Sequence, residues 1–550
     1  MSHPHLLVSL GLLALASAPS FGQSPSLPAA GCPQVMPTLG AQPSAQDLSD
    51  FNRWMTCLGP RLAASKAHAL LLDGIETALE PLAAPKGALK KIKITTSLTH
   101  WEASSWSLTL DGGPSVQVAG YMPYSGLTTK AGVTAELVFE KPGFWKRLIP
   151  LLNLVKPFKF KKKKHEDKIV AVWVPSVKFP KWLLKFVSRN CLSDFSAWSP
   201  YRRTIALELL APCLNKAKAA GAKGVIAVLD QSPPHAEKQY LPFSRRLYDP
   251  TGSGVPGIHV DRAQRKLLET HAASTSNTRE VTLTLQGAVD PHATSDHLIY
   301  VLPGAHAKTA SEEVVLLQTH TDGPGAVEEN GVMALIALAH HYAAIPQKQR
   351  RRTLVFLFAT GHLVKEIEGA KDLIWETPPD WLAKTRASVA IEHLGTKEWA
   401  DSGTSGYGPL ADPSGKTRDE PALVFVTGGK HPFEKLAADH LPAARRIVIP
   451  ARRRLKWTFG REFFGEGQYI SCTGVPTVGY VPNPNYMASY ADQGGPSEYG
   501  HFEKLDKDRM LVELEAFRDL TQVLVSDPLA GWPSVTPDAE RCEEPKNPCR

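Results

Sequence analysis

Apolar and polar positions follow their clearest pattern in the second half of the chain. The apolar run Val314–Gln318 has the composition of a buried β-strand. Apolar residues then recur at helical spacing over Val332–Leu338, and Pro346 marks the end of the helix that this spacing predicts. Thr353–Phe358 is a second β-rich run. The order of these segments predicts a β–α–β unit with parallel strands.

Polar side chains that suit a metal ion follow the ends of these two strands. His320 and Asp322 come just after the first strand, Glu328 lies in the turn before the helix, and His362 follows the second strand. Because parallel strands open their carboxyl ends at one edge of a sheet, we expect the four side chains to meet there. Imidazole and carboxylate groups together suit a divalent ion of the zinc type.

The rest of the pattern predicts an α/β protein that contains one region with a different pattern of apolar and polar positions. The pattern is helical from Ser49 to about Leu82 and strand-like over Trp101–Leu110. Between residues 115 and 282, short β-rich segments alternate with Gly and Pro turns. Three predicted pieces lie in that region: the helix Leu214–Ala220, the strand Val225–Leu229, and a turn, strand and helix over Val255–Glu269.

Length, composition and charge bound the architecture. With 550 residues the chain exceeds one ordinary core, so we expect two or three domains. Its 43% hydrophobic and 21% charged residues are typical of a globular protein. The net charge of +8 sits largely in local runs, which argues against a nucleic-acid partner.

The basic runs have two interpretations each. Lys156–Lys168 is either a solvated loop or a contact for an anionic surface. Arg350–Arg352 and Arg452–Arg454 are either solvated caps or, for the second, a contact for a substrate carboxylate.

The N-terminus has the pattern of a secretory signal peptide. Residues 6–17 are apolar but too few to span a bilayer, and small residues follow up to Gly22 and Gln23. An N-terminal membrane anchor is the alternative. Because no later stretch is long and apolar enough for a transmembrane helix, we expect a secreted or periplasmic protein after removal of residues 1–22.

Export permits disulfides, and the chain has seven cysteines. Candidate pairs are Cys32–Cys57, Cys191–Cys213 and Cys542–Cys549. The sequence does not fix the connectivity, and the odd number leaves at least one thiol without an intramolecular disulfide.

The motifs at the strand ends, and their order, resemble those of the co-catalytic zinc aminopeptidase family, which includes glutamate carboxypeptidase II. His320-Thr321-Asp322 matches the family's His-x-Asp segment. Gly325-Ala326-Val327-Glu328 matches its Gly-Ala-x-Asp segment, with Glu in place of the Asp that bridges two metal ions. Phe358–His362 matches the segment that ends in a Glu-Glu pair, so that Gly361 stands at the general base and His362 at the metal ligand.

Later segments extend the resemblance. Glu392 stands where the family has a further Asp ligand, and His501 is the nearest match to its last His ligand. Gly465–Tyr469 and Gly474–Pro476 are similar to a Ser-Asp, aromatic, Gly-Ile-Pro segment of the family.

The resemblance implies a mixed, mostly parallel sheet flanked by helices, as in zinc exopeptidases. Because Cys191–Glu269 resembles a protease-associated (PA) domain, it also implies an inserted, mainly-β domain of that type. The expected organisation is a signal peptide (1–22), the first part of the peptidase-like domain (45–114), the PA-like region (115–288), the main part of the peptidase-like domain (289–526) and a Cys-containing tail (527–550).

The resemblance also implies a zinc site with one or two ions. Its ligands are His320, Glu328, His362, Glu392 and His501, with His393 as the competitor of Glu392. Asp322 is expected to orient His320 through the other ring nitrogen.

The missing general base is the main departure from the family. Glycine at position 361 cannot move a proton, so Glu329, Glu366 and Glu368 are the candidate substitutes. His340 and His341 lie on the predicted helix and are expected to be structural.

We therefore expect an exported, zinc-dependent, exopeptidase-like hydrolase that cleaves amide bonds in peptides or peptide-like substrates. The alternative is a catalytically inactive protein of the same fold that binds a ligand or a protein partner. The sequence has no serine nucleophile elbow, phosphate-binding loop or dinucleotide fingerprint, which argues against serine hydrolase, nucleotide and NAD chemistry.

Overall fold

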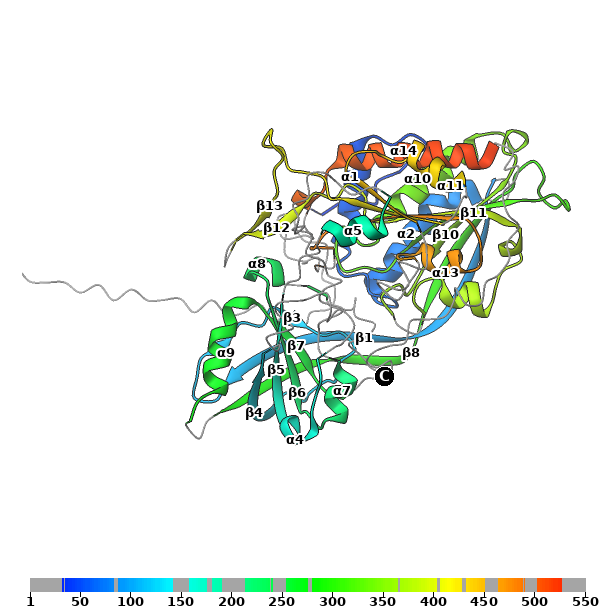
Figure 1. The fold of residues 1–550 in the computed structure, drawn as a ribbon. Helices are drawn as coiled ribbons and strands as arrows, with labels where there is room; N and C mark the ends of the chain where they lie inside the picture. The colour runs from blue at the N-terminus through cyan, green and yellow to red at the C-terminus, as the bar shows by residue number, and fades with distance from the viewer. Residues whose placement is uncertain are drawn as a thin grey trace, which may run out of the picture.

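One continuous β-sheet joins the two lobes of the molecule and carries the other elements (Figure 1). The computed structural model describes residues 32–33, 35–83, 88–141, 158–175, 181–189, 213–237, 239–240, 254–275, 279–364, 367–402, 406–427, 432–450, 463–487, 489 and 502–526. Within these residues the sheet has 14 strands, in the order β15-β14-β16-β11-β9-β10-β8-β4-β5-β6-β7-β3, with β1 paired to β8 and β2 paired to β1.

The large lobe contains a parallel centre. Four strands run in the same direction: β10 (Thr353–Ala359), β9 (Val314–His320), β11 (Thr385–Ile391) and β16 (Thr477–Pro482). Beyond β16 lie β14 (Ala422–Val426), which is antiparallel to it, and β15 (Arg446–Pro450). Every residue of β9 and β10 is buried, which explains their continuous apolar runs. The predicted β–α–β unit and the mixed, mostly parallel sheet are confirmed.

Helices cover both faces of this part of the sheet. One face packs against α1 (Ala45–Cys57), α2 (Lys66–Ala83), α10 (Gly331–Ala344), α11 (Pro432–His440) and α14 (Lys507–Ser526). The other face packs against α13 (Gly467–Cys472) and the π-helical turn η4 (Asp372–Glu376). The predicted helix before Pro346 is α10.

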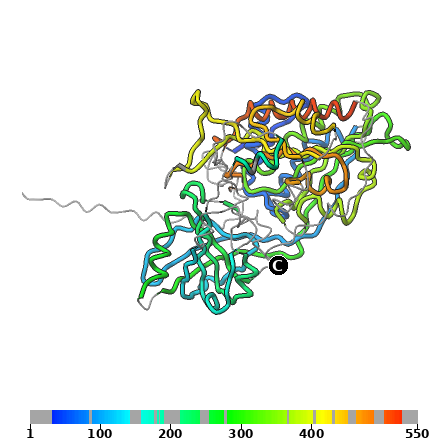
Figure 2. The backbone as a smooth tube through the Cα atoms, in the orientation of Figure 1, coloured from blue at the N-terminus to red at the C-terminus, as the bar shows by residue number. Residues whose placement is uncertain are grey.

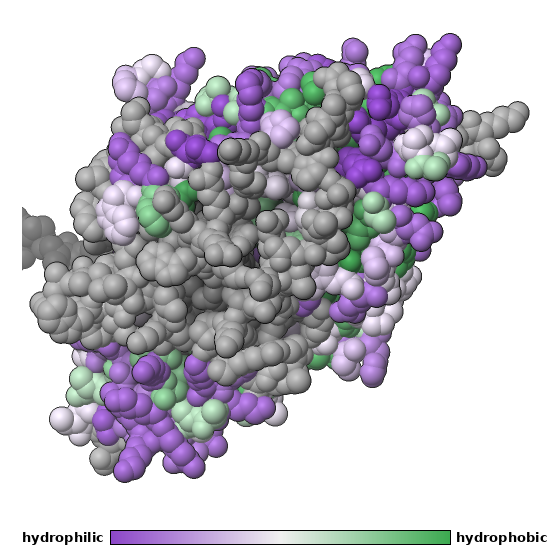
Figure 3. Space-filling model, turned by 45° about the vertical axis from the view of Figure 1, so that its right-hand side comes forward, coloured by the Kyte–Doolittle hydropathy of each residue, from purple (hydrophilic) through white to green (hydrophobic). Residues whose placement is uncertain are grey.

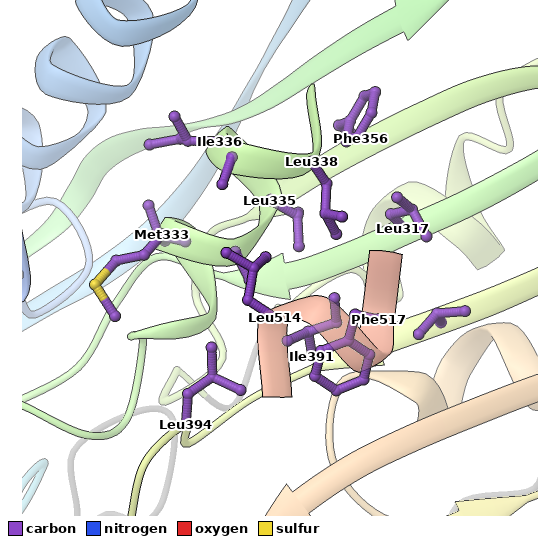
Figure 4. Close-up of a cluster of buried hydrophobic side chains, with 14 of the residues drawn as sticks. Leu317, Met333, Leu335, Ile336, Leu338, Phe356, Ile391, Leu394, Leu514 and Phe517 are labelled. Atoms are coloured by element: carbon purple, nitrogen blue, oxygen red, sulfur yellow. The ribbon is translucent and has the colours of Figure 1, made fainter. Parts of the chain in front are cut away.

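Side chains along β9 alternate between these two faces. Val315 and Leu317 belong to the core under α10 and α14, where Phe517 also packs (Figure 4). Val314 and Leu316 belong to the core on the opposite face. This alternation is the period of a β-strand, and it buries both faces, so only the strand ends are left for polar chemistry.

Two long antiparallel strands, β1 (Lys90–Leu110) and β8 (Glu280–Leu302), run from the large lobe into the small one (Figure 2). Next to β8 lies a parallel set: β4 (Val133–Glu140), β5 (Lys168–Val174), β6 (Gly224–Leu229) and β7 (Gly257–Val260). The short strands β2 (Ser115–Val116) and β3 (Gly120–Tyr121) pair with β1 and β7. β8 continues through residue 288, so the predicted border there lies inside a strand.

The small lobe has a core of its own. Its helices are α4 (Lys162–His165), α7 (Leu214–Ala219), α8 (Pro233–Ala236) and α9 (Arg265–Ala272), with the turn η2 (Arg262–Gln264) before α9. The predicted helix, strand and turn–strand–helix of this region correspond to α7, β6 and β7–α9. The resemblance to a PA domain stays a prediction.

Short elements complete the described chain. They are α5 (Lys181–Val187), η3 (Gln347–Gln349), η5 (Leu382–Lys384), η6 (Phe502–Lys504) and the hairpin of β12 (Trp399–Ser402) with β13 (Gly406–Pro409). Hydrophilic side chains dominate the described surface in the view of Figure 3, as expected when the apolar residues fill the cores. Within the described residues, no helix is both long and apolar enough to cross a membrane.

One of the three candidate disulfides lies within the described residues. Cys32 and Cys57 are bonded, as predicted, and their bond ties the segment before α1 to the end of that helix. Cys191, Cys542 and Cys549 lie outside the described residues, as do the predicted signal peptide and the tail 527–550.

The interpretation of Arg350–Arg352 as solvated caps is wrong for two of its residues. Arg350 and Arg352 are buried. Arg350 donates to the carbonyls of Tyr342 (3.0 Å) and Ile345 at the end of α10, where the last carbonyls of a helix need partners from outside it. In the basic run 156–168, Lys162, Lys164 and Lys168 form ion pairs with glutamates. Arg452–Arg454 lie outside the described residues.

Hydrogen bonds to Asp401 connect the two lobes. Asp401 on β12 accepts hydrogen bonds from the small lobe: from the N–H of Ser232 (3.2 Å), from Nδ1 of His235 (3.0 Å) and from Nη2 of Arg262 (2.9 Å). The His235 ring stacks on Tyr407 of β13, with centroids 4.5 Å apart. Burial would raise the pKa of the Asp401 carboxyl, but the bond and charge of His235, with Ser232 and Arg262, outweigh burial and lower that pKa to about 2.

We expect Asp401→Asn to lower the free energy of unfolding by about 1–2 kcal/mol at pH 7, after allowance for solvent screening of a partly exposed group. A carboxyl whose pKa is lower in the folded state stabilises the fold above its ordinary pKa near 4, and this contribution disappears as the pH falls toward 2. Urea unfolding at pH 7 and at pH 3 measures it. Asp111→Asn, at an exposed position, is the control. An equal loss at both pH values would contradict the role of the charge.

Candidate functional site

Three neighbouring parallel strands end at one point, and each delivers a histidine there. His320 is the last residue of β9 and lies opposite Ala359 of β10. His362 follows β10, and Glu392 and His393 follow β11. The predicted meeting of polar residues at this edge of the sheet is therefore confirmed.

Each of the three imidazoles is held by its outer nitrogen, Nδ1. His320 Nδ1 donates to the main-chain carbonyl of Asp322 (3.0 Å), and His393 Nδ1 donates to the carbonyl of Pro482 (2.6 Å). His362 Nδ1 bonds the carboxylate of Glu466. Because a carbonyl oxygen only accepts, the proton of His320 and of His393 lies on Nδ1, and the lone pair of Nε2 faces inward.

Two glutamates face these inner nitrogens. Glu328 places Oε1 3.9 Å from Nε2 of His362 and Oε2 3.5 Å from Nε2 of His393. Glu392 places Oε2 4.0 Å from Nε2 of His320 and 3.8 Å from Nε2 of His393. Among the described residues, Nε2 of His320 and Nε2 of His393 have no hydrogen-bond partner, although both are fully buried. Buried polar atoms of this kind need a ligand to compensate for lost water.

The cluster contains two sets of donor atoms, each within 4.8 Å of one another: His320, His362 and Glu392, and His320, Glu328 and His393. The rings of His320 and His362 stack with centroids 4.1 Å apart. Donors around one zinc ion lie about 3–3.5 Å apart, because each is about 2.1 Å from the metal. The separations of 3.5–4.0 Å seen here are close to that value, so these residues fit a zinc ion.

Burial controls the protonation of the cluster. It lowers the pKa of His320 well below its ordinary value, with a further effect from His362 and His393, and it lowers the pKa of His393 to about 3. Burial also raises the pKa of Glu392 to about 8, helped by the charge of Glu466. The imidazoles of His320 and His393 are therefore neutral, which is the form that binds a metal ion.

The prediction that the Asp322 carboxylate orients His320 is wrong, because another atom of Asp322 contacts the ring. The main-chain carbonyl of Asp322 orients the ring, whereas its carboxylate accepts the N–H groups of His362 and Leu363, both at 2.9 Å. The carboxylate thus shapes the turn that presents His362. Burial raises the pKa of Asp322 to about 6, although these two N–H groups lower it.

Glu329, an expected substitute for the general base, is held by an arginine. Its carboxylate forms a buried ion pair with Arg61, which also donates to the carbonyls of Met55 (3.0 Å), Gly59 and Gly325. Burial raises the pKa of Glu329 to about 7, against the lowering effect of the Arg61 charge. The ion pair holds the loop after β9 in place, which argues against the expected role of Glu329 as the base.

The environment of Gly361 explains why no glutamate stands there. Its φ of +75° is a conformation that side chains rarely adopt, and an added Cβ would lie 3.0 Å from Cβ of Ile367. Glu368, another candidate base, bonds the hydroxyl of Tyr469. Glu366 and His501 lie outside the described residues, so their roles stay predictions.

Sequence reasoning left three residues of the site without a role. Glu466 entered the sequence analysis only as part of the segment Gly465–Tyr469, Arg61 had no predicted role, and His393 was named only as a competitor of Glu392. The signal for His393 was its place directly after Glu392 at a strand end, and the signal for Glu466 was its glycine neighbours. The ring of His340 donates to the carbonyl of Ala78 (2.9 Å), in line with the expected structural role. Within the described residues it forms no hydrogen bond with a residue of the site.

Comparisons with known proteins give the fold. No family model matches the sequence, and no curated protein matches it. Among solved structures, an aminopeptidase from Aneurinibacillus sp. strain AM-1 is 14% identical, with a TM-score of 0.52 over 90% of this chain and 96% of that chain. A peptidase M28 precursor from Shewanella amazonensis SB2B is 14% identical, with a TM-score of 0.59 over 90% and 97%. A zinc aminopeptidase from Bacillus subtilis is 14% identical, with a TM-score of 0.52 over 90% and 98%. The chain shares their fold.

We expect Arg61→Met to lower the free energy of unfolding by about 3–5 kcal/mol, because it leaves the Glu329 carboxylate buried without its counter-ion. The double variant Arg61→Met/Glu329→Gln loses less than the single one, since no charge is then stranded. Urea unfolding measures all of these variants. Arg279→Met, which removes an exposed partner of Glu136, is the matched control, with a loss of about 1 kcal/mol or less. A double variant that is less stable than Arg61→Met would contradict the pairing.

Proposed function

We propose that this chain is an exported, zinc-dependent hydrolase of amide bonds in peptides or peptide-like substrates, with exopeptidase-like action. The observation that carries the proposal is the convergence of three imidazoles and two buried glutamates at the ends of β9, β10 and β11. The zinc aminopeptidase among the structures of the same fold supports it.

Five residues would hold the metal: His320, Glu328, His362, Glu392 and His393. A bound zinc ion would acidify a water molecule and polarise the amide carbonyl. The chain's own contribution is orientation, since carbonyl and carboxylate groups behind each ring fix its tautomer and angle. One or two ions are compatible with the two donor sets.

Proton transfer is where this site departs from the expected pattern. Position 361 carries no carboxylate, and the side chain of Ile367 lies where one would begin. This observation favours the second candidate function, a protein of the same fold that binds a ligand or partner without turnover. Hydrolysis by this chain would need a carboxylate from elsewhere, of which Glu366 and Glu368 remain candidates.

Export rests on two observations. The first 22 residues have the pattern of a signal peptide, and Cys32 is bonded to Cys57. We propose a secreted or periplasmic location for the mature chain.

We expect the purified mature protein to contain about one or two zinc ions per chain, and His320→Ala and His393→Ala each to lose them, because both supply inner nitrogens. Elemental mass spectrometry measures the metal content. His306→Ala, at an exposed position, is the matched control and keeps the metal.

The same samples separate the two functions. Zinc together with release of amino acids from a peptide library supports the hydrolase. Zinc with no release moves the proposal to the binding protein. A wild-type chain that takes up no zinc, even when zinc is added, contradicts the zinc-dependent hydrolase and leaves the binding protein as the function.

We expect Gly361→Glu not to raise the hydrolytic rate, because the backbone at +75° and the contact with Ile367 prevent the new carboxylate from reaching the site. Gly361→Ala should lower the free energy of unfolding by about 1–3 kcal/mol. Gly415→Ala has a similar φ of +86° in open space and isolates the cost of the backbone alone. A tenfold or greater gain in rate for Gly361→Glu would show that Ile367 gives way.

A further inference from the structure

A chain of hydrogen-bonded side chains lies directly behind the cluster. Thr321 stands between His320 and Asp322, and its hydroxyl meets Nε2 of His68 from α2 at 2.8 Å. Nδ1 of His68 meets the hydroxyl of Ser295 from β8 at 3.2 Å, and this hydroxyl meets that of Thr360 at 2.8 Å. Thr360 comes two residues before His362. The four side chains therefore connect the segment that carries His320 to the segment that carries His362.

The direction of each hydrogen bond in this chain of four side chains, here called the circuit, follows from the acceptor at its end. The Thr321 hydroxyl donates to the carbonyl of Ala359 (3.1 Å), so it must accept from Nε2 of His68. Nδ1 of His68 then has no proton and accepts from Ser295, and Ser295 accepts from Thr360. Every donor in the circuit has one acceptor, and the circuit closes on Ala359, the residue before Thr360.

A second histidine anchors the circuit toward the surface. The N–H of Thr360 donates to Nδ1 of His297 (3.2 Å), so the proton of His297 lies on Nε2, which faces Asp372 at 3.2 Å. Asp372 also accepts from the hydroxyl of Thr96 (2.7 Å). His68, Thr321 and Thr360 are fully buried. Burial lowers the pKa of His68 to about 3, so the ring is neutral, as the circuit requires.

We propose that Thr321, His68, Ser295 and Thr360 form a positioning circuit that fixes the spacing of the His320 and His362 rings, and so sets the affinity of the site for its metal ion. This inference rests on the proposed zinc site. None of the four is among the five residues proposed to hold the metal. They act through the main chain at the ends of β9 and β10, whose last residues, His320 and Ala359, are paired.

The circuit differs from ordinary core packing in what its loss would change. A misplaced ring costs metal affinity even where the fold survives, and residues that orient metal ligands typically contribute 10- to 100-fold in affinity. Ordinary packing would instead affect only the unfolding transition. A pair of substitutions that keeps shape but removes or keeps the hydroxyl separates these effects.

The experiment measures zinc affinity of the full mature chain by competition with a chromophoric chelator, alongside thermal unfolding. Thr360→Val removes the hydroxyl at nearly constant shape and should weaken zinc binding about 10- to 100-fold. Thr360→Ser keeps the hydroxyl and should restore the affinity. His68→Phe should match Thr360→Val. His340→Phe removes a histidine from α10 whose one hydrogen bond among the described residues is to the carbonyl of Ala78, and it should leave the affinity unchanged.

The outcomes are distinct. Wild-type zinc affinity in Thr360→Val and His68→Phe, with a lower unfolding temperature, overturns the circuit and leaves the zinc site standing. Equal weakening in Thr360→Val and Thr360→Ser also overturns it, because the hydroxyl is then irrelevant. Absence of zinc from the wild-type chain overturns the zinc site itself, and the circuit with it.

The tautomers of the histidine rings test the direction of the circuit without any measurement of activity. Nitrogen-15 spectra of the imidazoles should show His68 and His297 both protonated at Nε2 and His320 and His393 at Nδ1 in the metal-free protein. A His68 protonated at Nδ1 would contradict the direction of the circuit.

Discussion

The ion pair between Arg61 and Glu329 is the interaction on which the site depends. Two opposite charges are fully buried beside the cluster, and such burial is tolerated only when the remaining donors also find partners. Arg61 meets this requirement by binding main-chain carbonyls on both sides, at Gly59 and Gly325. The loop after β9 is thereby fixed to the end of α1, and Glu328 is directed into the cluster. A Cβ at Gly323 would collide with the Glu329 carboxylate, so even the turn residue is set by this pair.

Those parts of the structure that depend on local pattern could be predicted from the sequence. β9, α10 and β10 follow from apolar periodicity, and parallel strand ends bring His320, Asp322, Glu328 and His362 to one edge. Glu392 was expected at this edge only from the resemblance to a known family. What could not be predicted depends on contacts between distant segments. The Arg61–Glu329 bond joins residues 268 positions apart, and the Glu466–His362 bond joins residues 104 positions apart. The first half of β1 was missed because its polar alternation reflects partial exposure beside β8 rather than a buried run.

The chemistry of the cluster follows from its burial. Carboxylates alone would concentrate negative charge where no water is available to screen it, and burial already raises the pKa of Glu392 to about 8. Neutral imidazoles supply ligand atoms without charge, so His320 and His393 make a cluster of this depth less costly to fold without an ion. The cluster thus combines three imidazoles with two glutamates, and the glycine at position 361 supplies no group that could move a proton.

The two strands that join the lobes have a consequence for how the chain reaches this structure. Pairing of β1 with β8 brings together residues such as Thr95 and Asp296, which are 201 positions apart. Closing so long a loop carries an entropic cost, and contacts of this kind form slowly. Because most of the small lobe lies between the two strands in sequence, we expect its collapse to bring the strand ends together and so to shorten the loop that their pairing must close.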